Sequence, residues 1–119
     1  MGRILIVDDN SRFRALAAEL LAARGFEVVA EAADGAQALA AVGRGCPDGI
    51  LLDLNLPEPE PDGFAVAALL AAACAQARIV LTSAEVDHVP AEVMRTCAAT
   101  AFVAKQELAD ADLRALFSC

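Results

Sequence analysis

Short runs of apolar residues alternate along this chain with longer segments in which apolar positions recur at helical spacing. Five runs are short and nearly continuous, as in strands buried on both faces of a sheet: residues 4–7, 26–31, 49–52, 78–81 and 101–104. Between the first two, the i, i+3, i+4, i+7, i+8 spacing of an amphipathic helix is set by Phe13, Leu16, Ala17, Leu20 and Leu21. Gly25 follows as a helix stop.

Further helices are expected at residues 35–43 and 64–75, from Pro90 onward, and through a last apolar stripe of Leu108, Ala109, Leu113, Leu116 and Phe117. The alternation of five strands with helices predicts a (βα)5 arrangement. Right-handed crossovers with helices on both faces then require a doubly wound parallel sheet. A length of 119 residues allows one domain with one core.

Polar residues stand where four of the strand runs end. Asp8 and Asp9 follow the first run, Asp53 follows the third, Thr82 the fourth and Lys105, the only lysine, the fifth. Because open α/β sheets place their sites at the carboxyl ends of the strands, these side chains are expected to converge at one edge.

Three carboxylates at one edge indicate a bound cation. Asp8, Asp9 and Asp53 would repel one another without one, and Mg²⁺ prefers oxygen ligands. The alternative is that the segment from Asp9 to Ser11 merely caps the first helix. Capping accounts for one acid but leaves the other two unexplained.

The same residues favour phosphoryl chemistry. Asp53 as a nucleophile would form an acyl phosphate, which is a covalent strategy open to carboxylates. Phosphoryl transfer depends mainly on positioning and charge neutralisation. Lys105 would supply a point charge and Thr82 a hydroxyl donor.

Composition excludes several other classes. A net charge of −8 argues against nucleic-acid binding by this chain, since a phosphate backbone needs a basic face. No apolar stretch reaches the ~18 residues of a membrane span. The N-terminus enters a strand directly and does not resemble a signal peptide, so a cytoplasmic protein is expected.

Cysteine and histidine are not expected to carry function. The cysteines are far apart and form no C-x-x-C pair, and a single histidine cannot complete a zinc set. Buried, reduced thiols are therefore expected, apart from an exposed Cys119 at the terminus; the other three are Cys46, Cys74 and Cys97. His88 is expected at the surface.

Taken in order, the strand-end motifs resemble the receiver domain of two-component response regulators, related to the chemotaxis response regulator. The resemblance covers essentially the whole chain, residues 1–119, and rests on ILIVDD at 4–9, LDLNLP at 52–57, Asp62-Gly63, VLTS at 80–83 and FVAK at 102–105. It implies a flavodoxin-like three-layer sandwich whose parallel strands have the order 2-1-3-4-5.

The resemblance also implies roles for particular residues. Asp53 would be the phosphoacceptor, charged from the phosphohistidine of a histidine kinase. Mg²⁺ would be held by Asp8, Asp9, Asp53 and the backbone carbonyl of Asn55. The phosphate-binding and switch set would be Thr82, Ser83, Phe102 and Lys105. Apart from its own phosphorylation and slow dephosphorylation, such a chain is no enzyme, and it signals through a downstream protein or an output domain.

Three departures from the family pattern accompany the resemblance. Gln106 replaces the usual proline, as in the branch with helix-turn-helix output domains, which the segment 31–35 also resembles. Ala101 replaces a common glycine, and the proline-rich loop 57–63 is about two residues longer than usual. A phosphorylation-linked homodimer, a stand-alone chain and a fragment of a larger regulator all stay open.

Two other protein classes fit these residues less well. A haloacid-dehalogenase-like phosphatase would need a D-x-D motif near the first strand, whereas Asp53-Leu54-Asn55 lies on the third and lacks the second acid. A pseudo-receiver that only binds partners would not need the complete set of Asp8, Asp9, Asp53, Thr82 and Lys105.

Overall fold

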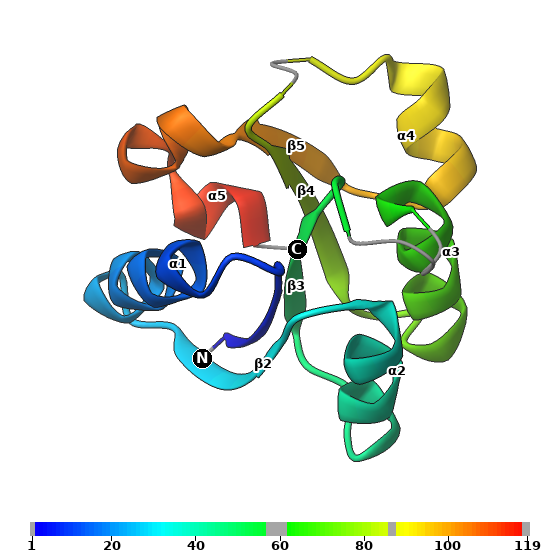
Figure 1. Ribbon diagram of the computed structural model, residues 1–119, viewed down its shortest axis with the longest axis horizontal. Coiled ribbons are helices and arrows are strands. Elements are labelled where there is room, and N and C mark those ends of the chain that lie inside the picture. The colour runs from blue at the N-terminus through cyan, green and yellow to red at the C-terminus, as the bar shows by residue number, and fades with distance from the viewer. Residues whose placement is uncertain (1, 57–61, 86–87, 118–119) are drawn as a thin grey trace.

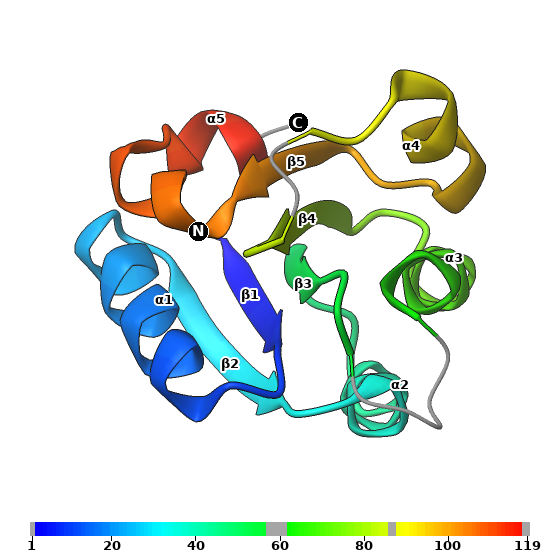
Figure 2. The same cartoon turned by 45° about the horizontal axis from the view of Figure 1, so that its top comes forward.

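Five parallel strands form one sheet in the order β2-β1-β3-β4-β5, as expected (Figures 1 and 2). The computed structural model describes residues 2–56, 62–85 and 88–117. The elements are β1 (Arg3–Val7), α1 (Ser11–Ala23), β2 (Glu27–Ala32), α2 (Gly35–Gly43), β3 (Gly49–Asp53), α3 (Gly63–Ala73), β4 (Arg78–Ser83), α4 (Ala91–Cys97), β5 (Ala101–Ala104), the 3-10 helix η1 (Lys105–Asp110) and α5 (Leu113–Phe117).

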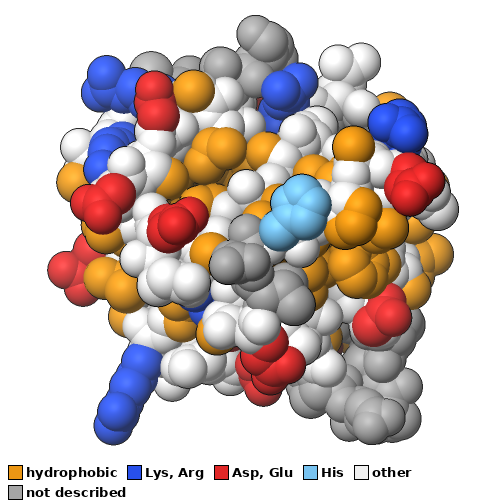
Figure 3. Space-filling model, turned by 90° about the horizontal axis from the view of Figure 1, so that it is seen from above, with side chains coloured by type: hydrophobic (Ala, Val, Ile, Leu, Met, Phe, Trp, Pro, Cys, Tyr) orange, Lys and Arg blue, Asp and Glu red, His pale blue; other side chains and the backbone are white. Residues whose placement is uncertain are grey.

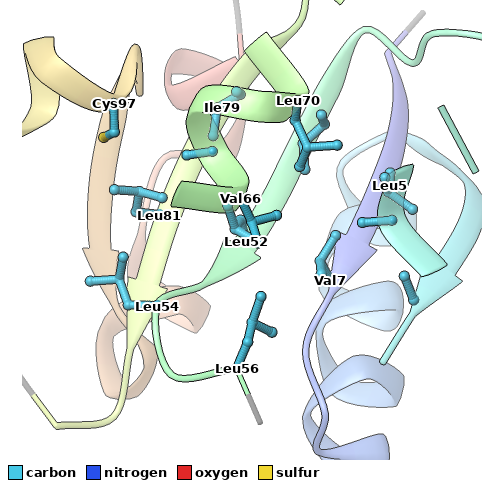
Figure 4. Close-up of a cluster of buried hydrophobic side chains, with 14 of the residues drawn as sticks. Leu5, Val7, Leu52, Leu54, Leu56, Val66, Leu70, Ile79, Leu81 and Cys97 are labelled. Carbon is cyan, nitrogen blue, oxygen red and sulfur yellow. The ribbon is translucent and has the colours of Figure 1, made fainter. Parts of the chain in front are cut away.

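Helices cover both faces of the sheet, and successive strand residues point to opposite faces. In β1, Ile4 and Ile6 join the core beneath α1, η1 and α5, whereas Leu5 and Val7 join the core beneath α2, α3 and α4. Figure 4 shows the second core, with side chains of β1, β3 and β4 packed against α3. Burial on both faces explains why the strand runs are almost continuously apolar.

Side-chain caps fix where three of the helices begin. Asn10 Oδ1 accepts the N–H groups of Arg12 and Phe13 at 3.0 and 3.2 Å and so starts α1. Asp34 and Asp62 cap α2 and α3 in the same way. Each cap supplies an acceptor to a helix end that has unpaired donors, and it sets the direction in which the chain leaves the preceding strand or loop.

The chain after β5 differs from the single helix that the apolar stripe predicts. It forms η1 and the short α5, separated at Ala111, whose extended backbone (φ −74°, ψ 151°) interrupts the helical path. Asp112 then accepts the N–H of Ala115 at 3.1 Å and starts a new helix. Leu108 and Leu113 are both buried, so two short helices fill the space expected for one.

Smaller differences lie at element ends. β2 is shifted by one residue from the expected 26–31, and α3 ends at Ala73. Leu16 belongs to the predicted apolar stripe of α1 but is 49% exposed, because Phe13, Ala17 and Leu21 make the contact with the sheet. Residues 57–61 of the proline-rich loop lie outside the described residues.

The prediction of reduced thiols is wrong for two cysteines. Cys46 and Cys74 form a disulfide, with their Cα atoms 5.7 Å apart, in the ordinary range for such a bond. The packing of the last turn of α3 beside the loop between α2 and β3 brings them together across 28 positions of sequence. Cys97 is free and buried, as expected, and Cys119 lies outside the described residues.

His88 is exposed, as expected. Within residues 2–56, 62–85 and 88–117, none of the helices has both the length and the apolar character needed to cross a membrane.

Candidate functional site

Three carboxylates meet at the carboxyl edge of the sheet, as the strand ends predict. One oxygen from each of Asp8, Asp9 and Asp53 lies within 4.8 Å of the others. Asp8 and Asp53 are 0% and 2% exposed, while Asp9 stands at the surface. Two buried acids and one exposed acid therefore make a small cluster with an open side.

The turn after β1 places Asp8 and Asp9. Asp8 continues the sheet by donating its N–H to the carbonyl of Ala32 at 2.9 Å, and its Oδ1 accepts the N–H of Asn10 at 2.8 Å. Arg14 donates to the Asp8 carbonyl at 2.6 Å and pairs with Glu31, which clamps the turn from outside. Because Asn10 supplies the cap of α1, capping does not account for the neighbouring acids.

Lys105 brings the one ammonium group to this cluster. Its Nζ lies 2.7 Å from Asp8 Oδ2 and 3.5 Å from Asp53 Oδ2, so it bridges the two buried acids. It also lies 4.4 Å from the ring centroid of Phe13, at cation–π distance. One ammonium group cannot neutralise three carboxylates, and an excess of negative charge is left beside it.

The Asp53 carboxyl carries the clearest electrostatic signature of the site. Burial raises its pKa from 3.8 to about 6. The nearby Asp8 charge adds to this increase, whereas the Asn55 N–H and Lys105 oppose it. A bound cation would favour the charged form, because it supplies the positive charge that the protein provides only in part.

The donor set fits a hard divalent cation. Carboxylate oxygens from two strand ends are the ligand type that Mg²⁺ takes, and Mg²⁺ usually keeps waters for its other positions. The exposed Asp9 leaves the cluster accessible from solvent. The residues present therefore suit magnesium with solvent or phosphate oxygens completing its shell.

Thr82 supplies a buried hydroxyl at the edge of the sheet. It pairs in register with Asp53 across β3 and β4, and its side chain is fully buried. Its Oγ1 has no hydrogen-bond partner among the described residues. An unpaired buried hydroxyl costs free energy, so its position opposite Asp53 is a specific feature of the site.

Ser83 and Asn55 form a polar network beside the cluster. Ser83 Oγ donates to Asn55 Oδ1 at 2.9 Å and accepts the N–H of Glu85 at 3.0 Å. Asn55 donates its own N–H to Asp53 Oδ1 at 3.1 Å. Ser83 thus shapes the loop after β4, whereas the Thr82 hydroxyl makes no hydrogen bond within the described part of the chain.

Phe102 lies on β5, beside the strand that carries Thr82. It pairs in register with Leu81 on β4, next to Thr82, and packs partly buried against the core beneath α4. It also borders a surface hollow with Met94 and His88. Hydrophobic side chains gather around the histidine on this face of the molecule (Figure 3). Phe102 thus connects the neighbourhood of Thr82 with the surface near α4.

Three residues at the site escaped the sequence interpretation. Arg14 and Glu31 hold the turn after β1, and their pairing links two elements that no motif joins. Phe13 was expected only as a core residue, yet its ring lies against the Lys105 ammonium. An aromatic early in the helix that follows the acidic pair was the available signal for it.

Comparison with known proteins agrees with this arrangement. Residues 4–117 match the family model of the response regulator receiver domain. The chain is 43% identical over 82 residues to the chemotaxis protein CheY of Bacillus subtilis, covering 69% of this chain and 67% of that protein. It spans about a quarter of the length of the protein-glutamate methylesterases of Anaeromyxobacter dehalogenans and Myxococcus xanthus that it also matches.

Solved structures show the same fold. The signal receiver domain of the putative response regulator NarL from Mycobacterium tuberculosis has a TM-score of 0.75 at 31% identity, covering 97% of this chain and 95% of that one. The response regulator TrrA of Thermotoga maritima, in complex with Mg²⁺ and BeF, has a TM-score of 0.80 at 29% identity, covering 98% and 99%.

Proposed function

Since this chain belongs to the receiver domain family of two-component response regulators, we propose that its Asp53 accepts a phosphoryl group from the phosphohistidine of a histidine kinase. One observation carries the proposal: Asp53 lies at one edge of the sheet with an acidic pair, the Lys105 ammonium and the hydroxyl of Thr82, which has no partner among the described residues. The coarse function, a receiver of phosphoryl signals, follows from the family.

In the proposed step, a carboxylate oxygen of Asp53 forms a bond to phosphorus as the P–N bond of phosphohistidine breaks. The bonding electron pair returns to the imidazole, which takes up a proton. Because this transfer needs positioning and charge neutralisation above all, the residues around Asp53 have mainly electrostatic roles. Small phosphodonors such as acetyl phosphate would react at the same carboxylate.

Asp8, Asp9, Asp53 and the backbone carbonyl of Asn55 are the proposed holders of Mg²⁺. Bound there, the ion would offset the negative charge of the carboxylates and the incoming phosphoryl group. The Mg²⁺ named for the related TrrA structure and the oxygen donor set of this chain support the assignment.

Lys105 and Thr82 are proposed to read the phosphorylated state. The ammonium group already lies 3.5 Å from Asp53 Oδ2 and is placed to pair with a phosphoryl oxygen. Thr82 would donate its free hydroxyl to another oxygen, which would end the cost of leaving it unpaired. Ser83 completes the proposed phosphate-binding set from the next position of β4.

Phe102 is proposed to carry the change to a partner surface. Phosphorylation adds roughly −1.5 to −2 charge at Asp53, enough to favour a second packing of the residues around it. A shift of Thr82 toward the phosphoryl group would release space beside Phe102, which neighbours it across β4 and β5. Partner binding near α4 and α5, by a downstream protein or an output domain in the cytoplasm, would then report the signal.

Acetyl phosphate labelling followed by intact mass measurement tests the proposal. With Mg²⁺ present, the wild-type chain should gain the mass of one phosphoryl group, and chelation of the ion should suppress the gain. Asp53→Asn should show no adduct. Asp48→Asn, at an exposed acid outside the cluster, should label like wild type. An unlabelled wild type, or an Asp53→Asn variant that labels fully, would sink the assignment.

A further inference from the structure

A second chemically distinctive feature lies at the other end of the strands, away from Asp53. Cys46 stands in the loop that leads into β3, and Cys74 is the residue that caps the end of α3. Their disulfide ties that loop to α3, which lies with α2 on one face of the sheet (Figure 1). Nothing in the proposed phosphoryl chemistry requires this bond.

We propose that Cys46–Cys74 is a reversible thiol–disulfide site, exchanged by low-molecular-weight thiols, and that its oxidation state sets the stability of the segment carrying Asp53. The two cysteines differ in exposure, because Cys46 is an exposed residue whereas Cys74 is 3% exposed. A thiolate from solvent therefore meets Cys46 first. Bonds with an accessible sulfur are the exchangeable ones.

The exchange takes place in two steps. The incoming thiolate bonds to Cys46 Sγ, the Sγ–Sγ bond breaks, and Cys74 leaves as a thiolate that takes up a proton. A second thiol then attacks the external sulfur and frees Cys46, so one protein disulfide and two thiols give one protein dithiol and one small disulfide. In reverse, the small disulfide is the oxidant.

The surroundings also accommodate the reduced form. Cys46 Sγ lies 3.5 Å from the carbonyl oxygen of Ala73. In the disulfide this sulfur has no hydrogen to donate, but after reduction its thiol finds an acceptor in place. Cys74 follows Val66 and Leu70 at four-residue spacing in the core, where a free thiol behaves as a small apolar side chain. Both oxidation states can thus belong to a folded protein.

The bond encloses the part of the chain that carries the acceptor. Residues 46–74 include β3 with Asp53, as well as α3. At its other end, α3 begins against the residue after Asp53, since Gly63 donates its N–H to the Leu54 carbonyl at 3.1 Å. A Cβ at Gly63 would overlap the Leu54 backbone. In the oxidised form α3 is therefore fixed at both ends, one of them adjacent to the acceptor.

The test is a redox titration of the whole chain, with Cys119→Ser to remove the terminal thiol. The protein is equilibrated with glutathione at varied ratios of reduced to oxidised form, quenched with acid, alkylated after unfolding and weighed. Two thiols should appear together over one transition. In the same series the thermal midpoint should fall by about 5–15 °C on reduction, since loop closure is lost.

Matched variants separate this site from general thiol effects. Cys46→Ser should lose the redox response and show the lower midpoint under all conditions. Cys97→Ser removes the buried free thiol and should keep the full response. The proposal is overturned if both sulfurs stay as thiols at every ratio. It is equally overturned if the bond survives every ratio while the protein is folded, since the bond would then be a fixed cross-link.

Discussion

Carboxylates at the two ends of the same parallel strands differ in their exposure and in their partners. At the amino end, Asp48 is exposed, and its Oδ2 accepts the backbone N–H of Arg3 at 2.8 Å. At the carboxyl end, Asp8 and Asp53 are buried beside each other, and Lys105 is the ammonium group that they share. The carboxylate at the amino end has a hydrogen-bond donor from the backbone, whereas the carboxyl end has three carboxylates around one ammonium group.

The difference separates stability from function along one sheet. The amino end is closed by backbone hydrogen bonds on both sides of Asp48 and by the disulfide. The carboxyl end concentrates groups that cost free energy in the absence of a ligand: a cluster of acids, and a hydroxyl with no partner among the residues that the structure describes. The proposed Mg²⁺ and phosphoryl group would supply partners for these groups.

The largest test of this contrast removes one positive charge from each end. In metal-free buffer at pH 7, Lys105→Ala should lower the free energy of unfolding by about 2–4 kcal/mol, since it leaves Asp8 buried without its partner. Arg3→Ala keeps the backbone N–H that binds Asp48 and should cost less than about 0.5 kcal/mol. Urea unfolding measures both. Equal losses would show that the two ends do not differ in their dependence on charge.

A second test uses the raised pKa of Asp53. Because folding raises this pKa from 3.8 to about 6, the native state binds more protons than the unfolded state within that window. Stability therefore falls as pH rises through it. Asp53→Asn removes the penalty and should stabilise the metal-free protein by about 1–3 kcal/mol at pH 7.

The pH profile distinguishes this cause from a general effect of the substitution. The gain of Asp53→Asn over wild type should shrink as pH falls through the window and vanish well below pH 3.8, where the wild-type carboxyl is protonated in both states. Asp48→Asn is the charge-matched control at the exposed acid. A gain that is constant from pH 4 to pH 7 would assign the effect to packing instead.

Magnesium provides a third and smaller test. At a free Mg²⁺ concentration ten times its Kd, the wild-type chain should gain about 1.4 kcal/mol of stability by mass action. Asp9 is exposed, so Asp9→Asn should leave the metal-free stability within about 0.5 kcal/mol while removing most of the gain. Asp48→Asn should keep it. A full gain in Asp9→Asn would place the ion elsewhere.

Sequence alone predicted the sheet and the residues that meet at its edge. Both follow from one rule: short apolar runs became buried parallel strands, and the residue after each run had to emerge at the same end. Asp8, Asp53 and Lys105 are accordingly where their strand ends put them. These three residues lie close together because their strands are neighbours in the sheet, whatever the conformation of the loops that follow.

The pattern of apolar and polar residues could not predict features that depend on packing between distant segments. Cys46 and Cys74 pair only because the end of α3 comes to rest beside the loop before β3, and no spacing rule joins them. The break at Ala111 lies inside a continuous apolar stripe and depends on how two short helices fill the space beside β5. Whether the Thr82 hydroxyl has a hydrogen-bond partner among the described residues depends on where all its neighbours lie, and the sequence does not give their positions.

The finest test compares two threonines at opposite ends of the sheet. Thr100 Oγ1 donates to the Ile79 carbonyl at 2.8 Å, so Thr100→Val should cost about 0.5–1 kcal/mol. Thr82→Val removes a buried hydroxyl that has no partner among the described residues, and it should leave the stability unchanged or raise it by up to about 1 kcal/mol.

Phosphorylation should reverse this order. When acetyl phosphate and Mg²⁺ are added, Thr82→Val should still label on Asp53 but gain less thermal stability than wild type, because its side chain cannot donate to a phosphoryl oxygen. Thr100→Val should gain as much as wild type. If Thr82→Val were costly without phosphate and gained fully with it, the hydroxyl would have a structural partner in the resting protein. The hydroxyls of Thr82 and Thr100 would then not differ in their pairing, and the contrast between the two ends of the sheet would not extend to them.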